Sequence, residues 1–394
     1  MYCFALQRIK NCESRFVLLL SKYMAPQEFT FSDLQSAFTD FISDVTGPTS
    51  GPRFGSSEIS QANNTKFTGI SSLENAVSGS LIFCLKPQLS ATALASAAAG
   101  IVVPKKLFAE LKSADKMLIA SPAPELLMAM AIQKFILPSP YRDLTQDLRG
   151  RHPTALVDAS AEIHPSVVIG PHVVIGKKVK IAAGSYIGAG SVIEAYSEIG
   201  EATTIQALVV IGTRVRIGAR CEISSHSIVG KEGFGYAHDA AGNHVRIPHQ
   251  GWVVIEDDVH LGACNTVDRG TFGETRIGQG TKTDNQVHIA HNCRVGRGCL
   301  LTSGFKMGGS SSIGNFVVTG GNTLIGGHLH VTDQVNLAAQ SAVSKNIDKA
   351  GDYGGSPLLP LQQFLKMKST MTQLPEMRKQ LSQLMKKIFP DETT

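Results

Sequence analysis

Residues 168–188 read "VIGPHVVIGKKVKIAAGSYIG", and an isoleucine returns in this stretch every six residues. The spacing extends well beyond it. From Val157 to Val229, thirteen consecutive positions at this interval hold Ile or Val. After an interruption the repeat resumes at Ile255 and continues, with one further shift, to Val343. An α-helix repeats every 3.6 residues and a half-buried strand every two, so neither explains a period of six.

A period of six is typical of a parallel β-helix, in which each hexapeptide forms one flat side of a triangular prism. Three hexapeptides form one coil of 18 residues, and the aliphatic residue of each points inward. Successive coils should then stack at the spacing of paired strands, about 4.8 Å. Glycine often follows the aliphatic residue, as Gly170 follows Ile169, and we expect it there because a corner requires a positive φ. The sequence predicts a mainly β fold with this β-helix over 151–345.

The flanks lack the repeat and predict two further parts. Residues 24–130 favour a small α/β domain, with a helix over 29–42 capped by Ser32 and strands within 66–85 and 97–104. A linker is expected at 131–150, where Pro138 and Pro140 lie. Residues 346–394 predict a C-terminal segment with an amphipathic helix over 374–389. Residues 1–23 are interpreted as an extension or as a mis-set start ahead of Met24.

Composition excludes several classes of protein. The net charge of +5 is too weak and too dispersed to indicate nucleic-acid binding. The longest early apolar run, "FVLLL" at 16–20, is far too short for a membrane span. Seven cysteines form no CxxC pair, so free thiols in a reducing compartment are expected. Cys293 and Cys299 are interpreted as packing residues stacked on one side of the prism.

Two segments interrupt the repeat, at 231–250 and at 268–276. A solenoid accommodates extra residues where they project outward, so both segments should bulge from the prism. The longer one contains Phe234, Tyr236 and three histidines among glycines. It could cover a ligand groove or pack against a neighbouring subunit, and the residues alone do not separate these alternatives.

The stretch "DNQVHIAHN" at 284–292 carries the clearest candidate for chemistry. Ile289 takes the inward position, so His291 should lie near a corner of the prism. Gly309 lies one coil beyond His291, and His328 lies two coils and one residue beyond it. Zinc requires three or four convergent ligands. His288 directly precedes the inward Ile289 and should point in a different direction from His291, so these two histidines should not form part of one zinc site. A general base with a neighbouring backbone amide is favoured over a metal site.

These segments also resemble a known family. "GFGYAHDAAGN", "DRG", "DNQVHIAHN", "GHLHV" and "SPLLPL" are similar to motifs of the UDP-3-O-(3-hydroxyacyl)glucosamine N-acyltransferases of lipid A biosynthesis. Residues 67–87, "FTGISSLENAVSGSLIFCLKP", resemble the uridine-binding domain of that family. The resemblance covers roughly 28–365. It implies that the β-helix is left-handed.

The resemblance also implies roles for site residues. His291 would accept a proton from the glucosamine 2-amine, and the Gly309 amide would stabilise the oxyanion. His328 would orient the acyl 3-hydroxyl group. Asp284 and Asn285 would position the substrate or the base. No covalent enzyme intermediate is implied.

Phe83 matches an aromatic residue that stacks on the uracil base in the family. Leu89 stands where a second aromatic residue often follows in the family, so the sequence supplies one stacking ring for the base and not two. His288 takes a position where the family commonly has glutamine, so it is given no catalytic role.

By the resemblance, the donor is a 3-hydroxyacyl-acyl carrier protein and the acceptor is UDP-3-O-acyl-glucosamine. A homotrimer in the cytoplasm is implied, with no cofactor and no metal. Four basic residues of the C-terminal helix could dock the acidic carrier or simply be solvated: Arg378, Lys379, Lys386 and Lys387. Two alternatives remain, a related hexapeptide O-acyltransferase and a non-enzymatic β-helical scaffold.

Overall fold

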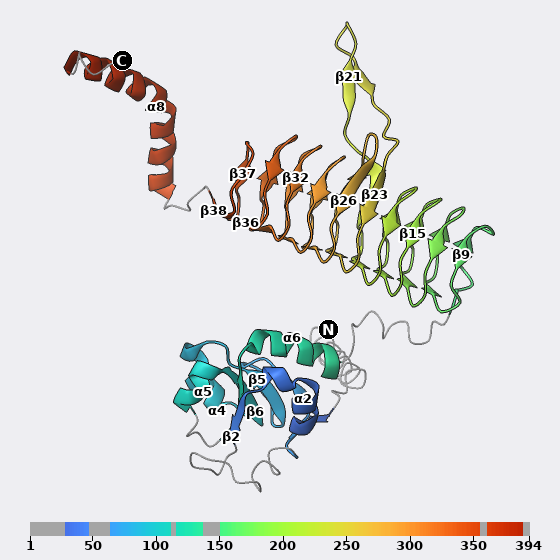
Figure 1. Ribbon diagram of the computed structural model, residues 1–394, viewed down its shortest axis with the longest axis vertical. Helices are drawn as coiled ribbons and strands as arrows, with labels where there is room; N and C mark the ends of the chain where they lie inside the picture. The colour runs from blue at the N-terminus through green and yellow to red at the C-terminus, as the bar shows by residue number, and fades with distance from the viewer. Residues whose placement is uncertain (1–27, 47–63, 112–115, 137–149, 355–360, 389–394) are drawn as a thin grey trace, which may run out of the picture. The chain divides into compact units, whose positions relative to one another are not determined.

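The computed structural model describes residues 28–46, 64–111, 116–136, 150–354 and 361–388. The proposed extension at 1–23 lies outside these ranges. The chain divides into two compact units, Met1–Gln146 and Asp147–Thr394, and each is described by itself (Figure 1).

The N-terminal unit is built around one mixed sheet with the strand order β2-β7-β6-β5-β4. Its strands are β2 (Asp44–Thr46), β4 (Gly69–Ile70), β5 (Ser80–Phe83), β6 (Gly100–Pro104) and β7 (Met117–Ser121). All neighbours are parallel except β2, which pairs antiparallel with β7. Alternate residues enter two separate apolar cores: Leu81 and Val102 belong to one, and Ile82 and Ile101 to the other. Both faces of the sheet are therefore covered, as expected for parallel strands.

Short helices and one further strand pair complete this unit. The helices are α2 (Phe31–Ala37), η1 (Thr39–Phe41), η2 (Pro87–Leu89), α4 (Ser90–Ala95), α5 (Lys105–Leu111) and α6 (Pro124–Phe135). Strand β1 (Phe29–Thr30) pairs antiparallel with β3 (Lys66–Phe67). The α/β architecture matches the expectation from the sequence.

The first helix is shorter than predicted, and its cap is a different residue. Thr30, and not Ser32, is the N-cap, and it forms a capping box with Asp33. Phe29 and Thr30 are extended because they pair with β3, so the helix cannot begin at Phe29. At the other end of the unit, α6 continues past the expected boundary to Phe135, whose buried ring stacks on Phe29.

The second unit contains a solenoid of three parallel sheets. The first sheet consists of β10 (Val168–Ile169), β13 (Tyr186–Ile187), β16 (Thr204–Ile205), β19 (Glu222–Ile223), β24 (His260–Leu261), β27 (Lys282–Thr283), β30 (Leu300–Leu301), β33 (Val318–Thr319), β36 (Val335–Leu337) and β38 (Gly351–Tyr353). The second consists of β8 (Leu156–Val157), β11 (Val174–Ile175), β14 (Val192–Ile193), β17 (Val210–Ile211), β20 (Ile228–Glu232), β25 (Thr266–Arg269), β28 (His288–Ile289), β31 (Lys306–Met307), β34 (Leu324–Ile325) and β37 (Ala342–Val343). The third consists of β9 (Glu162–Ile163), β12 (Lys180–Ile181), β15 (Glu198–Ile199), β18 (Arg216–Ile217), β23 (Trp252–Ile255), β26 (Glu274–Ile277), β29 (Arg294–Val295), β32 (Ser312–Ile313) and β35 (His330–Val331).

The coils stack as the repeat predicts. Ile175 pairs with Ile193, and Ile193 with Ile211, each 18 residues further along the chain. These side chains are buried and form one continuous apolar core. Backbone amides of each coil donate to carbonyls of the next, as Gly176 N donates to Ile193 O at 2.8 Å. Three parallel sheets of short strands at this interval fit a left-handed parallel β-helix (Figure 1).

The glycines that follow the inward residues have a different cause from the one predicted. The positive φ lies three residues after the inward residue, and 18 non-glycine residues adopt it, His172 and Asn292 among them. The glycine directly after the inward residue is required by space instead. At Gly188, for example, a Cβ atom would lie 2.5 Å from the backbone nitrogen of Ala207 in the next coil. The close approach of neighbouring coils therefore selects glycine at this position.

The two interruptions project as predicted. Lys231 and Glu232 still belong to β20, and the residues after them leave the prism and form an antiparallel hairpin of β21 (Tyr236–His238) and β22 (His244–Arg246) (Figure 1). In the second segment, residues 270–273 form a smaller bulge between β25 and β26, and the rest of 268–276 lies in these two strands. Because the extra residues leave at corners, the coils on both sides keep their register.

The C-terminal helix is longer than predicted. Strand β38 continues the first sheet to Tyr353, past the expected end of the solenoid at 345. Helix α8 (Leu361–Ile388) then includes Pro375, and Figure 1 shows it bent. Proline lacks the amide that an interior helical position donates, which accounts for a bend. No helix within the described ranges is long and apolar enough to cross a membrane.

Candidate active site

The stretch 284–292 spans two corners of one coil. Asp284 and Asn285 follow β27 at the corner between the first and second sheets. His291 follows β28 at the corner between the second and third sheets. Gly309 takes the same place as His291 in the next coil, because β31 pairs in register with β28. The structure therefore brings Gly309 to His291 and places Asp284 and Asn285 at the neighbouring corner.

The orientation of the His291 ring follows from its neighbour Asn292. Oδ1 of Asn292 accepts a hydrogen bond from Thr271 N at 2.9 Å, and its Nδ2 donates to Phe272 O at 2.7 Å. These two partners fix which end of the amide is oxygen. Nδ1 of His291 lies 3.2 Å from that oxygen and must be the protonated nitrogen, so Nε2 of the neutral ring is basic.

Gly309 lies against the basic nitrogen. A Cβ atom at Gly309 would lie 2.5 Å from Nε2 of His291, so only glycine fits there. Its carbonyl accepts from His328 N at 3.0 Å, while no acceptor within the described residues takes its own amide hydrogen. A backbone donor without a protein partner close to a basic nitrogen is one arrangement that can serve acyl transfer.

His328 lies one coil beyond Gly309. It is exposed and occupies the left-handed corner position, with φ 59°. The backbone hydrogen bond between them ties these coils together at the corner of His291. The strand register thus places His291, Gly309 and His328 at the same corner of three successive coils, with His328 one residue past the equivalent position.

The corner of Asp284 and Asn285 is occupied by backbone contacts. Asp284 accepts from Asn285 N at 2.7 Å and from Ser303 N at 3.2 Å. Oδ1 of Asn285 accepts from Ala263 N at 2.7 Å. Within one chain, these side chains stabilise coil stacking and do not reach the His291 ring.

Phe83 lines a pocket of about 530 Å³ in the N-terminal unit. The pocket is lined by Ile70, Ser71, Ser72, Leu73, Glu74, Phe83, Leu85, Lys86, Leu89, Met128, Ile132 and Ile136. Phe83 ends β5 and is half-buried. Leu89 lies in the same wall, where the sequence lacks the second aromatic residue. The pocket is predominantly apolar, with Lys86 and Glu74 as its charged groups.

His288 lies on the outward face of β28, beside Thr266 of the preceding coil. Its Nδ1 lies 2.8 Å from Oγ1 of Thr266, and its Nε2 lies 3.9 Å from Asp268 Oδ2. The buried Asp268 carboxylate also pairs with Lys231 at 2.9 Å. Within the described part of the chain, no three His, Cys, Asp or Glu side chains are arranged to hold a metal ion.

Cys293 and Cys299 are packing residues, but they do not share a side of the prism. Cys293 precedes β29 of the third sheet and Cys299 precedes β30 of the first, because six residues advance the chain by one side. Both thiols are fully buried, and burial raises the pKa of Cys293 to about 11. A thiol with that pKa is a poor nucleophile near neutral pH.

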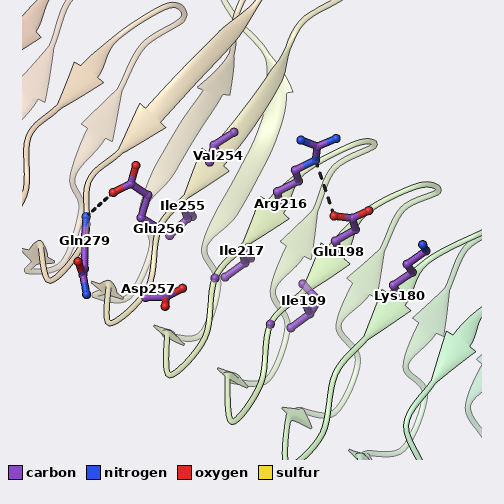
Figure 2. A pocket seen from close by; sticks show the side chains of 12 residues that line it. Lys180, Glu198, Ile199, Arg216, Ile217, Val254, Ile255, Glu256, Asp257 and Gln279 are labelled. Atoms are coloured by element: carbon purple, nitrogen blue, oxygen red, sulfur yellow. Dashed lines mark hydrogen bonds and ion pairs between the residues drawn. The ribbon is translucent and has the colours of Figure 1, made fainter.

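A further groove of about 720 Å³ lies on the third sheet, away from this edge (Figure 2). Lys180, Glu198 and Arg216 alternate in charge along it. Arg216 lies 3.7 Å from Glu198, and Glu256 accepts from Gln279 N at 3.0 Å. These groups are solvated and partnered by one another, and exposed pairs of this kind contribute little free energy.

Two residues near His291 were not identified from the sequence. Asn292 is the neighbour that fixes the tautomer, and its place directly after His291 was the available signal. His249 lies at the end of the inserted hairpin, with its ring centroid 5.1 Å from that of His291. The sequence offered only a count of histidines in the insertion, because nothing local predicts where a projecting loop returns.

The fold defines a hexapeptide-repeat β-helix protein. Residues 151–234 match the family described as the GMPPB C-terminal domain. The chain is 47% identical over 149 residues to the UDP-3-O-acylglucosamine N-acyltransferase of Wolinella succinogenes, covering 38% of this chain and 47% of that protein. It is 48% identical over 148 residues to the enzyme of the same name from Helicobacter hepaticus, covering 38% and 45%.

The chain spans about half the length of the curated relatives it matches. Among solved structures, the UDP-N-acetylglucosamine acyltransferase from Campylobacter jejuni is similar, at 26% identity and a TM-score of 0.34. That similarity covers 50% of this chain and 68% of that one.

Proposed function

We propose that this protein is an N-acyltransferase that moves a 3-hydroxyacyl chain from acyl carrier protein to the 2-amine of UDP-3-O-acyl-glucosamine, in lipid A biosynthesis. Relatives at 43–48% identity are named UDP-3-O-acylglucosamine N-acyltransferase, a name that gives the acceptor and the transfer to nitrogen. The observation that supports it most directly is the pairing of a basic Nε2 on His291 with the free amide of Gly309.

The proposed reaction uses these two groups in sequence. The amine nitrogen attacks the thioester carbon, and Nε2 of His291 takes the proton that the nitrogen loses. The negative charge on the carbonyl oxygen is stabilised by the Gly309 amide. The C–S bond then breaks, and the proton on His291 passes to the departing thiolate. A positioned base typically contributes a factor of about 10² to 10⁴ in rate.

A direct transfer is consistent with the state of the cysteine beside this corner. The nearest thiol in sequence is Cys293, which is fully buried and donates to Gly308 O at 3.2 Å. Its raised pKa opposes formation of a thiolate. We infer that no acyl-enzyme forms on this residue.

The further roles carried over from the resemblance are proposals of the same kind. His328 is exposed on the same edge and would orient the acyl 3-hydroxyl group. Phe83 would stack on the uracil base within its pocket. Asp284 and Asn285 would position substrate only from the adjacent corner, where each already accepts backbone hydrogen bonds.

We also propose a homotrimer located in the cytoplasm. Phe272 lies in the smaller bulge, where its carbonyl oxygen accepts a hydrogen bond from Asn292, and its side chain is 76% exposed. The side chain of Phe234 in the hairpin is 83% exposed. Large exposed aromatic rings beside a site favour contact with another chain. Five free thiols in the described residues fit a reducing compartment.

Helix α8 offers a surface for the donor protein. Its basic residues are exposed, and so are the apolar residues Met377, Leu381, Leu384 and Ile388. An acidic carrier protein would be attracted to Arg378, Lys379, Lys386 and Lys387. Reversing these charges should raise the KM for the carrier and leave kcat unchanged.

The test is a transfer assay with UDP-3-O-acyl-glucosamine and 3-hydroxyacyl-acyl carrier protein, comparing the wild type with His291→Ala. We expect amide product from the wild type and a loss of at least about 10²-fold in kcat from the variant. A parallel assay with UDP-N-acetylglucosamine tests hydroxyl acylation. Product from that acceptor alone, or equal activity of His291→Ala, would contradict the proposal.

A further inference from the structure

The inserted hairpin returns to the prism at His249, which is almost fully buried. Strand β22 ends at Arg246, and the chain re-enters the third sheet at Trp252. Between them, Nδ1 of His249 lies 3.0 Å from the carbonyl oxygen of Ile247. A carbonyl only accepts, so Nδ1 carries the hydrogen and Nε2 of the neutral ring is an acceptor.

That acceptor has no donor. Nε2 of His249 is buried and lacks a hydrogen-bond partner among the described residues. Leaving a buried polar atom unpaired costs about 1–3 kcal/mol, so such an atom requires an explanation. The hydrogen bond to Ile247 accounts for Nδ1 of His249. It does not account for the choice of an imidazole ring at this position.

The ring contacts His291. The two centroids are 5.1 Å apart and the planes meet at 70°, which is an edge-to-face arrangement. Gly233, at the start of the hairpin, packs into the same junction. A Cβ atom on it would lie 3.0 Å from both Nε2 of His249 and Cβ of His291. The junction is therefore closely filled from the side of the hairpin.

The hydrogen bond from His291 to Asn292 is long, at 3.2 Å, so it restrains the imidazole weakly by itself. An edge-to-face neighbour at 5.1 Å supplies a second restraint, because it takes up space beside the His291 ring into which the ring would otherwise turn. A misplacement of about 1 Å at a reacting group can reduce the rate about 10²-fold.

We propose that His249 is a positioning residue: its ring braces the imidazole of His291 so that Nε2 faces Gly309, and its bond to Ile247 anchors the hairpin to this brace. The inference rests on the proposed function for its kinetic test. In this proposal the insertion supports the catalytic base, and the contact with His291 is the reason that position 249 holds a ring. An imidazole provides both this ring contact and the hydrogen bond to Ile247, and its Nε2 is left unpaired as a consequence.

Three substitutions separate the ring from its polar atoms. His249→Ala removes both, His249→Asn retains a donor for Ile247, and His249→Phe retains the ring. We expect kcat to fall about tenfold to 100-fold in the Ala and Asn variants, with KM within about twofold of the wild type. His249→Phe should recover kcat to within about threefold of the wild type.

His244→Ala is the matched control. His244 forms an edge-to-face pair with His238 at 4.8 Å in the same hairpin, but both rings are exposed. Its kcat should equal that of the wild type. Melting temperatures of all variants identify any general loss of folding.

An unchanged kcat in His249→Ala, a Phe variant as slow as the Ala variant, or a loss confined to KM would overturn the proposal. A crystal structure of His249→Ala provides a readout that is independent of the reaction. We expect a rotated or doubly placed His291 ring, and a ring still bonded to Asn292 in one position would contradict the brace. If the wild type transfers no acyl group, the proposed function fails, and this structure still decides the role of His249.

Discussion

Two corners of the same coil use similar residues in opposite ways. At the first corner, Asn285 accepts a backbone amide from Ala263, and Asp284 accepts two others. At the second, Asn292 accepts the amide of Thr271, but His291 and Gly309 retain a basic nitrogen and a free donor. Polar side chains at the first corner thus hold coils together, whereas the second corner leaves a ring nitrogen and a backbone amide unpaired, and it is the candidate active site.

Glycine at the second corner should be the most sensitive test of this difference. Gly309→Ala would place a methyl carbon 2.5 Å from Nε2 of His291, displacing the base. We expect a loss of about 10²-fold or more in kcat, because both the base and the oxyanion donor shift. Steady-state transfer kinetics provide the measurement.

Gly321→Ala is the matched control for Gly309→Ala. Gly321 also follows a glycine after an inward residue, but its Cβ would meet only Ser303 O, at 3.6 Å. Its activity should be close to that of the wild type. Equal losses at both glycines would show that the effect is one of folding and not of the site.

The two asparagines provide the next comparison. Each accepts a backbone amide from another turn of the chain, so replacing Asn285 with Ala should lower the free energy of unfolding by about 1 kcal/mol. Asn292→Ala should cost more, because Asn292 also donates to Phe272 O and adopts a positive φ. Only Asn292→Ala should also reduce kcat, by about tenfold, because His291 loses the group that fixes its tautomer.

Chemical denaturation and transfer kinetics on the two asparagine variants give both quantities. A matching loss of kcat in Asn285→Ala would mean that the first corner also takes part in the reaction, as the resemblance suggested for this residue.

Phe83 extends the comparison to the N-terminal unit. Phe83→Ala removes an aromatic side chain from the pocket of that unit and leaves the residues of both corners unchanged. We expect the KM for the nucleotide substrate to rise about tenfold, since stacking on a base is worth about 1–3 kcal/mol, with kcat unchanged. Isothermal titration with UDP gives an independent measure. Unchanged binding would exclude this pocket as the uracil site.

The smallest effect is expected at the buried thiols of the prism. Because burial raises the pKa of Cys293 to about 11, about 0.1% of it is thiolate at pH 8. Maleimide at that pH should label the exposed Cys264 and spare Cys293, and transfer activity should persist. Mass spectrometry of the labelled peptides checks this, with labelling of Cys293 in denaturant as the control.

The same thiol gives stability a pH dependence with a definite sign. Its pKa in the folded chain is above the ordinary value of 9.0, so the unfolded chain ionises first as the pH rises. Its contribution to stability is therefore complete below pH 9 and decreases above it, up to about pH 11.

The repeat was sufficient to predict the solenoid, because an inward aliphatic residue at every sixth position leaves one consistent packing. It also predicted the column from His291 to Gly309. The repeat did not predict why glycine follows the inward residue. Gly188 is required because a neighbouring coil lies close to it, and no local sequence pattern encodes that distance. The place of His249 was unpredictable for a related reason, since the return of a 20-residue insertion depends on contacts that it makes only when folded.

The way the solenoid absorbs its insertions has a consequence for how such proteins change. Paired residues are 18 apart in regular coils, 38 apart across the hairpin and 22 apart across the smaller bulge, yet the strands beyond remain in register. Residues added at a corner thus project from the prism, and the pairing of the coils that follow is unchanged. Such a scaffold can acquire a loop at a corner in a single genetic step without disturbing the coils that follow it.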